Sequence, residues 1–335
     1  MSIELLKPIC VVENPFLVSE NGMNFTCALI GLISLPIQIS TIYCILKKTP
    51  GTMSSVKQSL TNLIFWFIVS QIIFSFIEVP YVYFPYKALS FIGLGTQIGI
   101  PVVIQFYIIL IGNAGNLFFL IMLFENRSSS IILNRLKIDK VPSRVVFICV
   151  NVIGILSFPT FQLFNLQDQF EVKIEVLKTL PCPAEDFFEP STLILAFDGF
   201  SETYIIFSYV FMFSIAIFEM TFFSACCIYY LVFSTTTQIS STTRKFQLRS
   251  FWAITIQTLI PLLFVIIPIT ATMTKEKQGY SQVQNNQMVI LFLMHNGVAS
   301  LSILLAHAPY RKFLKSLIVR ERQNYIVFVS REFMK

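Results

Sequence analysis

Residues 93–124 read GLGTQIGIPVVIQFYIILIGNAGNLFFLIMLF, a long stretch without a charged side chain. A helix that crosses a bilayer core about 30 Å thick needs roughly 20 mainly apolar residues, and hydrocarbon leaves no partner for unpaired backbone groups. Six further apolar stretches lie along the chain, so the sequence predicts seven membrane-spanning helices. Their expected bounds are 22–46, 59–83, 93–124, 145–166, 204–233, 251–272 and 288–306.

The composition favours one helical membrane bundle over several soluble domains. The 335 residues are 55% apolar and 13% charged, with a mean hydropathy of +0.73, whereas about 25% of the residues of a soluble domain are charged. We expect an all-α protein with an extracellular segment at 1–21, a seven-helix bundle at 22–306 and a cytoplasmic tail at 307–335. The net charge of +6 is spread over several loops. The sequence therefore does not indicate a nucleic-acid partner.

The basic residues collect on alternate loops. Eighteen of the 24 Lys and Arg residues lie in three connecting segments and the tail, on the side that also holds the C-terminus. By the positive-inside rule, that side is cytoplasmic and the N-terminus is extracellular. The remaining six basic residues lie on the outer side: Lys7, Lys87, Lys173, Lys178, Lys275 and Lys277. No cleavable signal peptide is evident in residues 1–21.

Polar side chains within the spans are candidates for a small-molecule site. They are costly in hydrocarbon and usually face the bundle interior, where they either contact a ligand or form interhelical hydrogen bonds. Glu219 lies near mid-membrane and could pair with Gln257. Eight carboxylates between Asp168 and Glu202 either form a solvated face or attract cationic ligands. The candidate ligand residues are Glu78, Tyr81, Gln97, Gln105, Gln162, Tyr209, Glu219 and His295.

The predicted inner end of the third span carries a possible switch. Glu125 precedes Arg127 by two residues, and the carboxylate could hold the guanidinium in one state and release it to a cytoplasmic partner in another. After the seventh span, residues 310–322 are amphipathic, which is typical of a helix on an anionic inner leaflet. Tyr310 and Arg311 begin this helix and join the candidate coupling residues.

Seven cysteines are present, and two of them lie in the predicted extracellular segments. Because disulfides persist on the oxidising side of the membrane, we expect a bridge between Cys10 and Cys182. Cys27, near the outer end of the first span, is the alternative partner of Cys182.

Several short motifs follow one another along nearly the whole chain, at 43–46, 48–50, 53–57, 124–127, 167–169, 180–182 and 309–311. Their order and spacing resemble those of the nematode serpentine receptor class H chemoreceptors. This resemblance implies a G protein-coupled receptor for small chemical ligands, with a heterotrimeric G protein as its partner and the plasma membrane of sensory-neuron cilia as its location. The chain departs from the rhodopsin-like Asp-Arg-Tyr at 125–127, and Ile64 and Gln71 replace the usual His and acid of the second span.

The main alternative is a transporter or channel for a small solute. Such a protein would favour paired intramembrane charges or an internal repeat. Only Glu78 and Glu219 place carboxylates within spans, and no convincing repeat is evident. No catalytic motif indicates an enzyme. His295 and His307 are too few and too far apart to indicate a metal site, so no cofactor is expected.

Overall fold

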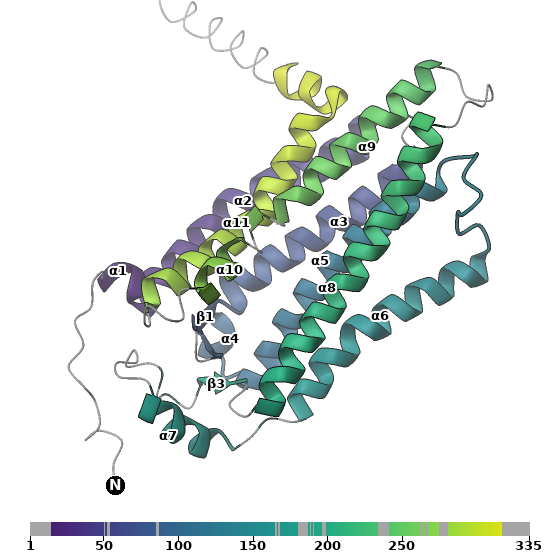
Figure 1. Cartoon of the computed structure of the whole chain (residues 1–335). Helices are drawn as coiled ribbons and strands as arrows, with labels where there is room; N and C mark the ends of the chain where they lie inside the picture. The colour runs from purple at the N-terminus through teal and green to yellow at the C-terminus, as the bar shows by residue number, and fades with distance from the viewer. Residues whose placement is uncertain are drawn as a thin grey trace, which may run out of the picture.

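The computed structural model describes residues 15–49, 51, 54–84, 87–164, 166, 168–179, 187, 189, 191–195, 199–233, 241–261, 263–264, 267–274 and 281–316. Within these ranges the chain forms a bundle of long helices (Figure 1). The principal helices are α2 (Glu20–Lys48), α3 (Ser54–Ile72), α5 (Val102–Ser129), α6 (Val141–Phe164), α8 (Gly199–Ile228), α9 (Ser241–Pro261) and α11 (Gln282–Ala306).

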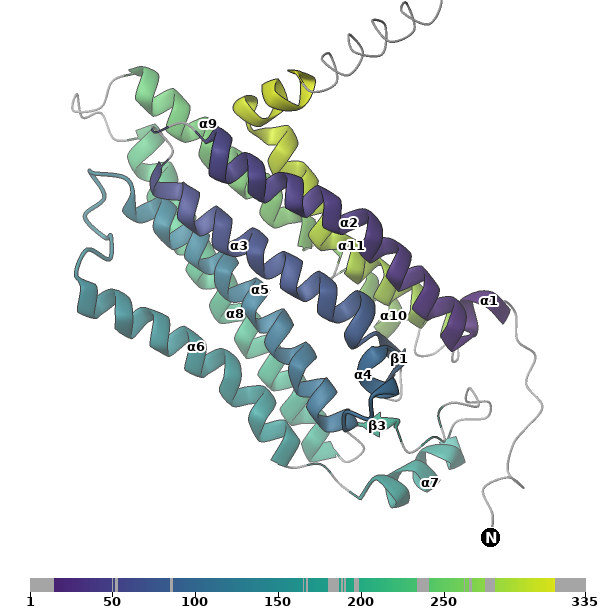
Figure 2. The same ribbon diagram turned by 180° about the vertical axis from the view of Figure 1, so that it is seen from behind.

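The two ends of the bundle differ. One end carries the helix α7 (Gln169–Thr179) and a small antiparallel sheet of order β1-β2-β3, and we call it the sheet end. The other end carries the helical residues 308–316, and we call it the tail end. Figures 1 and 2 show these features at opposite ends of the long helices. The strands are β1 (Pro80–Tyr83), β2 (Ala88–Phe91) and β3 (Leu193–Ile194).

The second helix ends earlier than the predicted span 59–83. α3 continues as the π-helical turn η3 (Ile73–Ile77), and strand β1 then begins at Pro80. Proline has no N–H and disfavours helical geometry in the residue before it, so the helix ends before Pro80. Residues 80–83 consequently pair with β2, with Tyr81 opposite Ser90.

The third long helix starts later than the predicted residue 93. A short helix α4 (Leu94–Gln97) comes first, and Gly99 then adopts a φ of 80°, which a side chain would disfavour. Pro101 is the N-cap of α5, where its missing N–H does no harm. α5 extends to Ser129, beyond the predicted end at 124.

The predicted sixth span, 251–272, is not one uniform helix. α9 ends at Pro261, and α10 (Ile267–Thr274) follows it toward the sheet end. The fifth helix, α8, ends in a second π-helical turn, η5 (Tyr229–Phe233). The single turn of α1 (Pro15–Val18) precedes α2, which begins at the N-cap Ser19.

Five stretches of the described residues are long and apolar enough to cross a membrane as helices. α6 contributes a shorter apolar helix, Val141–Ser157, and lies at the edge of the bundle beside α8 (Figure 2). The exposed faces of these two helices are rich in large apolar side chains. A bilayer is the solvent that suits such faces. The five stretches are Glu20–Lys48, Val56–Ile77, Val102–Ser129, Gly199–Phe233 and Gln282–Ala306.

Two large apolar clusters fill most of the bundle, and a third, smaller cluster joins strands β2 and β3 to the first half of α5. The tail-end cluster joins α2, α3, α5, α8, α9 and α11 and includes Leu60, Phe67 and Phe124. The sheet-end cluster joins the opposite ends of α2 and α11 to η3 and the small sheet, and it includes Phe74 and Tyr83. The core therefore extends over the whole length of the bundle but excludes most of α6.

Close packing of α3 on α5 depends on two glycines. Trp66 donates a hydrogen bond from Nε1 to the carbonyl oxygen of Gly112 at 2.9 Å. A Cβ at Gly115 would overlap the Trp66 ring, and one at Gly112 would lie 2.8 Å from Phe74 Cζ. Small residues at these positions thus allow the two backbones to approach, as in other membrane helix pairs.

We predict that Gly115→Ala lowers the thermal unfolding midpoint of the purified protein. Overpacking of this kind costs about 1–3 kcal/mol, and the displaced Trp66 ring would lose its bond to Gly112. Gly154→Ala in α6 is the matched control, because a Cβ there would meet nothing within 4 Å. Equal midpoints for the two variants would contradict this account of the α3–α5 contact.

Candidate ligand and coupling sites

Glu78 directly follows η3 at the sheet end, as its C-cap. Its side chain is fully buried, and neither carboxylate oxygen has a hydrogen-bond partner among the described residues. Gly95 of α4 lies against it, since a Cβ at that position would be 2.7 Å from Oε1. The carboxylate is therefore enclosed between the end of the second helix and the start of the next segment.

Two other candidate ligand residues make structural hydrogen bonds at the same end. The Tyr81 hydroxyl donates to the carbonyl oxygen of Val18, and its ring packs edge-on against Tyr83 with centroids 5.4 Å apart. The Gln105 amide donates to the carbonyl oxygen of Ile100 at 2.6 Å and accepts from the Thr96 hydroxyl at 3.1 Å. These bonds stabilise strand β1 and the break before α5, two segments for which the sequence predicted continuous helix.

Two further candidates, Gln97 and Tyr209, are more exposed than Glu78. Gln97 is exposed on α4, and Tyr209 of α8 is 37% exposed. Gln162 lies in α6, but its side chain is outside the described part of the structure. Gln97 and Tyr209 therefore do not join Glu78 in one buried group.

His295 lies in the middle of the bundle. Its buried ring contacts Phe67 of the tail-end cluster, with centroids 6.3 Å apart. On its other side it contacts Phe292, at 5.1 Å, which packs against the sheet-end cluster. Its Nδ1 is also hydrogen bonded to the Phe292 carbonyl oxygen. His295 thus links the two clusters.

Buried amides and a hydroxyl connect α2 to α3 and η3. The predicted ligand residues did not include this polar contact. Gln38 Nε2 donates to Gln71 Oε1 at 3.4 Å, and Gln71 Nε2 donates to the Ser75 hydroxyl at 2.8 Å. Gln38 Oε1 has no partner in the described structure. The available signal in the sequence was a glutamine in each of two apolar spans, Gln38 and Gln71.

Glu219 lies far from Glu78. It is 20 residues from the start of α8 at the sheet end, about 30 Å at 1.5 Å per residue, and so falls in the tail half. Asn151 of α6 donates to its Oε1 at 3.3 Å. The observed partner is Asn151, whereas the side chain of Gln257, which the sequence suggested, lies outside the described part of the structure.

Arg127 and Glu125 do not pair with each other at the tail end. Residues two apart on a helix point away from one another. Arg127 is 5% exposed and donates from Nη2 to the carbonyl oxygen of Gln247 in α9 at 2.6 Å. Glu125 instead forms an ion pair with Arg144 of α6 at 2.9 Å and accepts from the Ser129 hydroxyl at 2.8 Å. The two residues therefore connect α5 to different helices.

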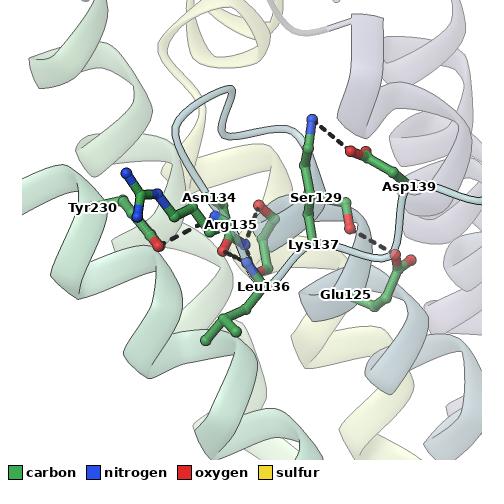
Figure 3. Close-up of polar contacts among 9 residues, drawn as sticks. Glu125, Ser129, Asn134, Arg135, Leu136, Lys137, Asp139 and Tyr230 are labelled. Atoms are coloured by element: carbon green, nitrogen blue, oxygen red, sulfur yellow. Dashed lines mark hydrogen bonds and ion pairs between the residues drawn. The ribbon is translucent and has the colours of Figure 1, made fainter.

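Polar contacts hold the loop between α5 and α6 (Figure 3). Asn134 donates to the Ser128 hydroxyl at 2.8 Å and accepts from the backbone N–H of Leu136 at 2.9 Å. The backbone N–H of Arg135 donates to the Tyr230 hydroxyl of η5 at 3.2 Å. The loop is thereby tied to both the third and the fifth long helices.

Tyr310 and Arg311 fix the turn after α11. The buried Tyr310 hydroxyl lies 2.7 Å from the Thr49 hydroxyl at the end of α2. Arg311 donates to the Ala306 carbonyl oxygen at 3.1 Å and so satisfies the end of the helix. Burial and the positive charges of Arg127 and Arg311 lower the pKa of His307 to about 4, so this ring is neutral at pH 7.

The expected bridge from Cys10 to Cys182 lies outside the described residues and stays a prediction. Cys27, the alternative partner, is buried with a free thiol.

The described geometry is that of a membrane helix bundle with a buried Arg at one end and an enclosed carboxylate at the other. The family described as "Serpentine type 7TM GPCR chemoreceptor Srh" matches residues 18–320. The chain belongs to the Srh family of chemoreceptors. Serpentine receptor class H-72 of Caenorhabditis elegans is 40% identical over 318 residues, which cover 95% of this chain and 92% of that relative.

Membership of the Srh family confirms the resemblance that the motifs indicated. The chain is a multi-pass membrane protein of a seven-helix receptor family, and its apolar helices agree with that assignment. In an Srh chemoreceptor, the buried polar contacts described above lie within or beside membrane helices, where unpaired polar groups are costly.

We predict that Arg144→Ala lowers the thermal unfolding midpoint more than Glu125→Gln does. Removal of the Arg, whose side chain is 44% exposed, leaves the buried Glu125 carboxylate without its cation, whereas the amide introduced by Glu125→Gln could still accept from Ser129. The measurement is thermal unfolding of both variants and the double variant. A larger loss in Glu125→Gln would show that the ion pair does not anchor α6 to α5 in this way.

Proposed function

We propose that the chain is a chemosensory G protein-coupled receptor. A small molecule binds in the sheet-end half of the bundle, and a heterotrimeric G protein binds at the tail end. Membership of the Srh family supports this assignment. The observation that carries it is the buried Arg127, which bonds α5 to α9 at the end where the basic residues collect.

In this proposal the sheet end is extracellular and the tail end is cytoplasmic. The positive-inside rule supports that orientation, because three connecting segments and the C-terminal tail together hold 18 of the 24 Lys and Arg residues. The receptor would reside in the plasma membrane, and the family resemblance favours sensory-neuron cilia. Residues 308–316 would lie along the inner leaflet, with Lys312 and Lys315 exposed to anionic lipid.

The ligand would act by its different affinity for two arrangements of the helices. Glu78, Tyr81, Gln105 and His295 are the buried candidates for the responsive region, and the π-helical turn η3 lies within it. Turns of this kind are frequent at functional sites. Because His295 contacts both apolar clusters, a ligand-driven change at the sheet end could reach the tail end through this ring.

Coupling would require the tail ends of α5 and α9 to separate. Arg127 would then exchange the Gln247 carbonyl oxygen for an acceptor on the G protein. Its Nε has no hydrogen-bond partner within the described residues, so the guanidinium can donate a further hydrogen bond to the G protein. The Glu125–Arg144 pair would remain, since it joins α5 to α6 and not to the moving helix.

We predict that Arg127→Ala abolishes second-messenger signalling while the receptor still reaches the cell surface. The variant loses the guanidinium that we propose for G protein contact. The assay uses cells that express the chain with a promiscuous G protein, together with a screen of volatile and water-soluble small molecules. Surface display of the N-terminus is measured in the same cells, and unchanged signalling would remove Arg127 from the mechanism.

Two variants serve as controls for this experiment. Gln247→Ala keeps the carbonyl oxygen that accepts from Arg127, so we expect signalling to persist. Arg135→Ala removes the same charge from an exposed side chain on the neighbouring loop. Loss of signalling in Arg135→Ala as well would assign the effect to the total charge of the tail end.

A further inference from the structure

The carboxylate of Glu78 is buried with nothing to neutralise it among the described residues. Neither oxygen has a hydrogen-bond partner, and the ion pairs of the described structure do not include it. A carboxylate removed from both water and donors is very unfavourable when ionised. By contrast, the other buried carboxylate described above, that of Glu125, has both an Arg and a hydroxyl partner. The position of Glu78 therefore suits a cationic partner that the described residues do not supply.

The backbone around Glu78 makes this position more favourable for a cation. Glu78 ends the continuous helix formed by α3 and η3, and helix C-termini carry partial negative charge. Its own N–H already donates to the Ile73 carbonyl oxygen at 2.7 Å. An acidic side chain at this end of a helix is the opposite of the usual preference, which places cations there.

Two glycines bring the following segment against this helix end. A Cβ at Gly95 would lie 2.7 Å and 2.8 Å from the two carboxylate oxygens of Glu78. A Cβ at Gly93 would overlap the Ile77 carbonyl oxygen. Side chains at either position would crowd the acceptor groups, so the glycines keep the carboxylate and the helix end clear of side-chain atoms from α4.

We infer that Glu78 recognises the ammonium group of a small organic amine. The inference rests on the proposed function and specifies its ligand class. An ammonium group supplies three donors, and the carboxylate oxygens and the terminal carbonyl groups of the helix supply acceptors. The surrounding sheet-end cluster, which includes Phe74 and Ile92, would contact the alkyl part of the ligand.

The test compares linear primary alkylamines with alcohols of the same chain length on the full-length receptor in lipid nanodiscs. The readout is the thermal unfolding midpoint as a function of ligand concentration at fixed pH and ionic strength. We expect amines, but not alcohols, to raise the midpoint of the wild type. Glu78→Gln, which keeps the shape and removes the charge, should raise the half-maximal amine concentration by at least about 30-fold, because truncation of one partner of a buried charge pair has a large effect.

Glu202→Gln is the matched control, because it removes a sheet-end carboxylate that is exposed and already paired with Lys87. It should respond to amines like the wild type. Gly95→Ala is a second test variant that retains the carboxylate but crowds it, and it should also weaken the amine effect. An equal amine effect in the wild type and Glu78→Gln would overturn the inference. So would the absence of any amine effect on the wild type, or stabilisation by sodium relative to choline without an amine effect.

The same variants distinguish this inference from the proposed function. Amine binding through Glu78 without a second-messenger response to any G protein would support the amine site and contradict the proposal of a coupled receptor. The opposite result is that other compounds activate signalling that depends on Arg127, that Glu78→Gln leaves this response unchanged, and that amines are inactive. It would support the coupled receptor and contradict the amine site.

Discussion

The bilayer core offers backbone N–H and C=O groups no water, and most of this structure follows from that constraint. Long helices satisfy those groups internally, and the irregular segments gather near helix ends. The strand that starts at Pro80 and the break before Pro101 both lie at the sheet end, where hydrogen bonds from Tyr81 and Gln105 support them. These two interruptions of the helices therefore lie at the end of the bundle where we propose that a ligand binds.

The same constraint makes a buried charged group without a partner unfavourable. Glu125 and Arg144 neutralise each other, and Glu219 has the Asn151 amide. Arg127 has only a backbone carbonyl oxygen as its hydrogen-bond acceptor in the described structure, and Glu78 has none. Arg127 and Glu78 thus lie at opposite ends of the bundle, which is the arrangement that a receptor for an external ligand and an internal partner requires.

Sequence reasoning identified the family and the apolar helices because both depend on local patterns, namely motif order and long runs without charge. It misplaced helix ends at Pro80 and Pro101, since it counted apolar residues beyond the prolines that interrupt them. It also assigned Glu125 to Arg127, although the i, i+2 spacing opposes that pair. The true partner, Arg144, lies across a loop whose fold depends on Asn134 and Tyr230, and no local pattern reveals such a contact.

The central claim is that the bond from Arg127 to α9 holds the tail end closed until a partner binds. Spin labels at the exposed positions Ile132 and Lys245 would report the separation of α9 from the loop that follows α5, with the exposed Cys149 replaced by serine. The account predicts that this distance lengthens when a nucleotide-free heterotrimeric G protein binds the full-length receptor, and that it is already longer in Arg127→Ala. A G protein that binds while the distance distribution stays unchanged would contradict it.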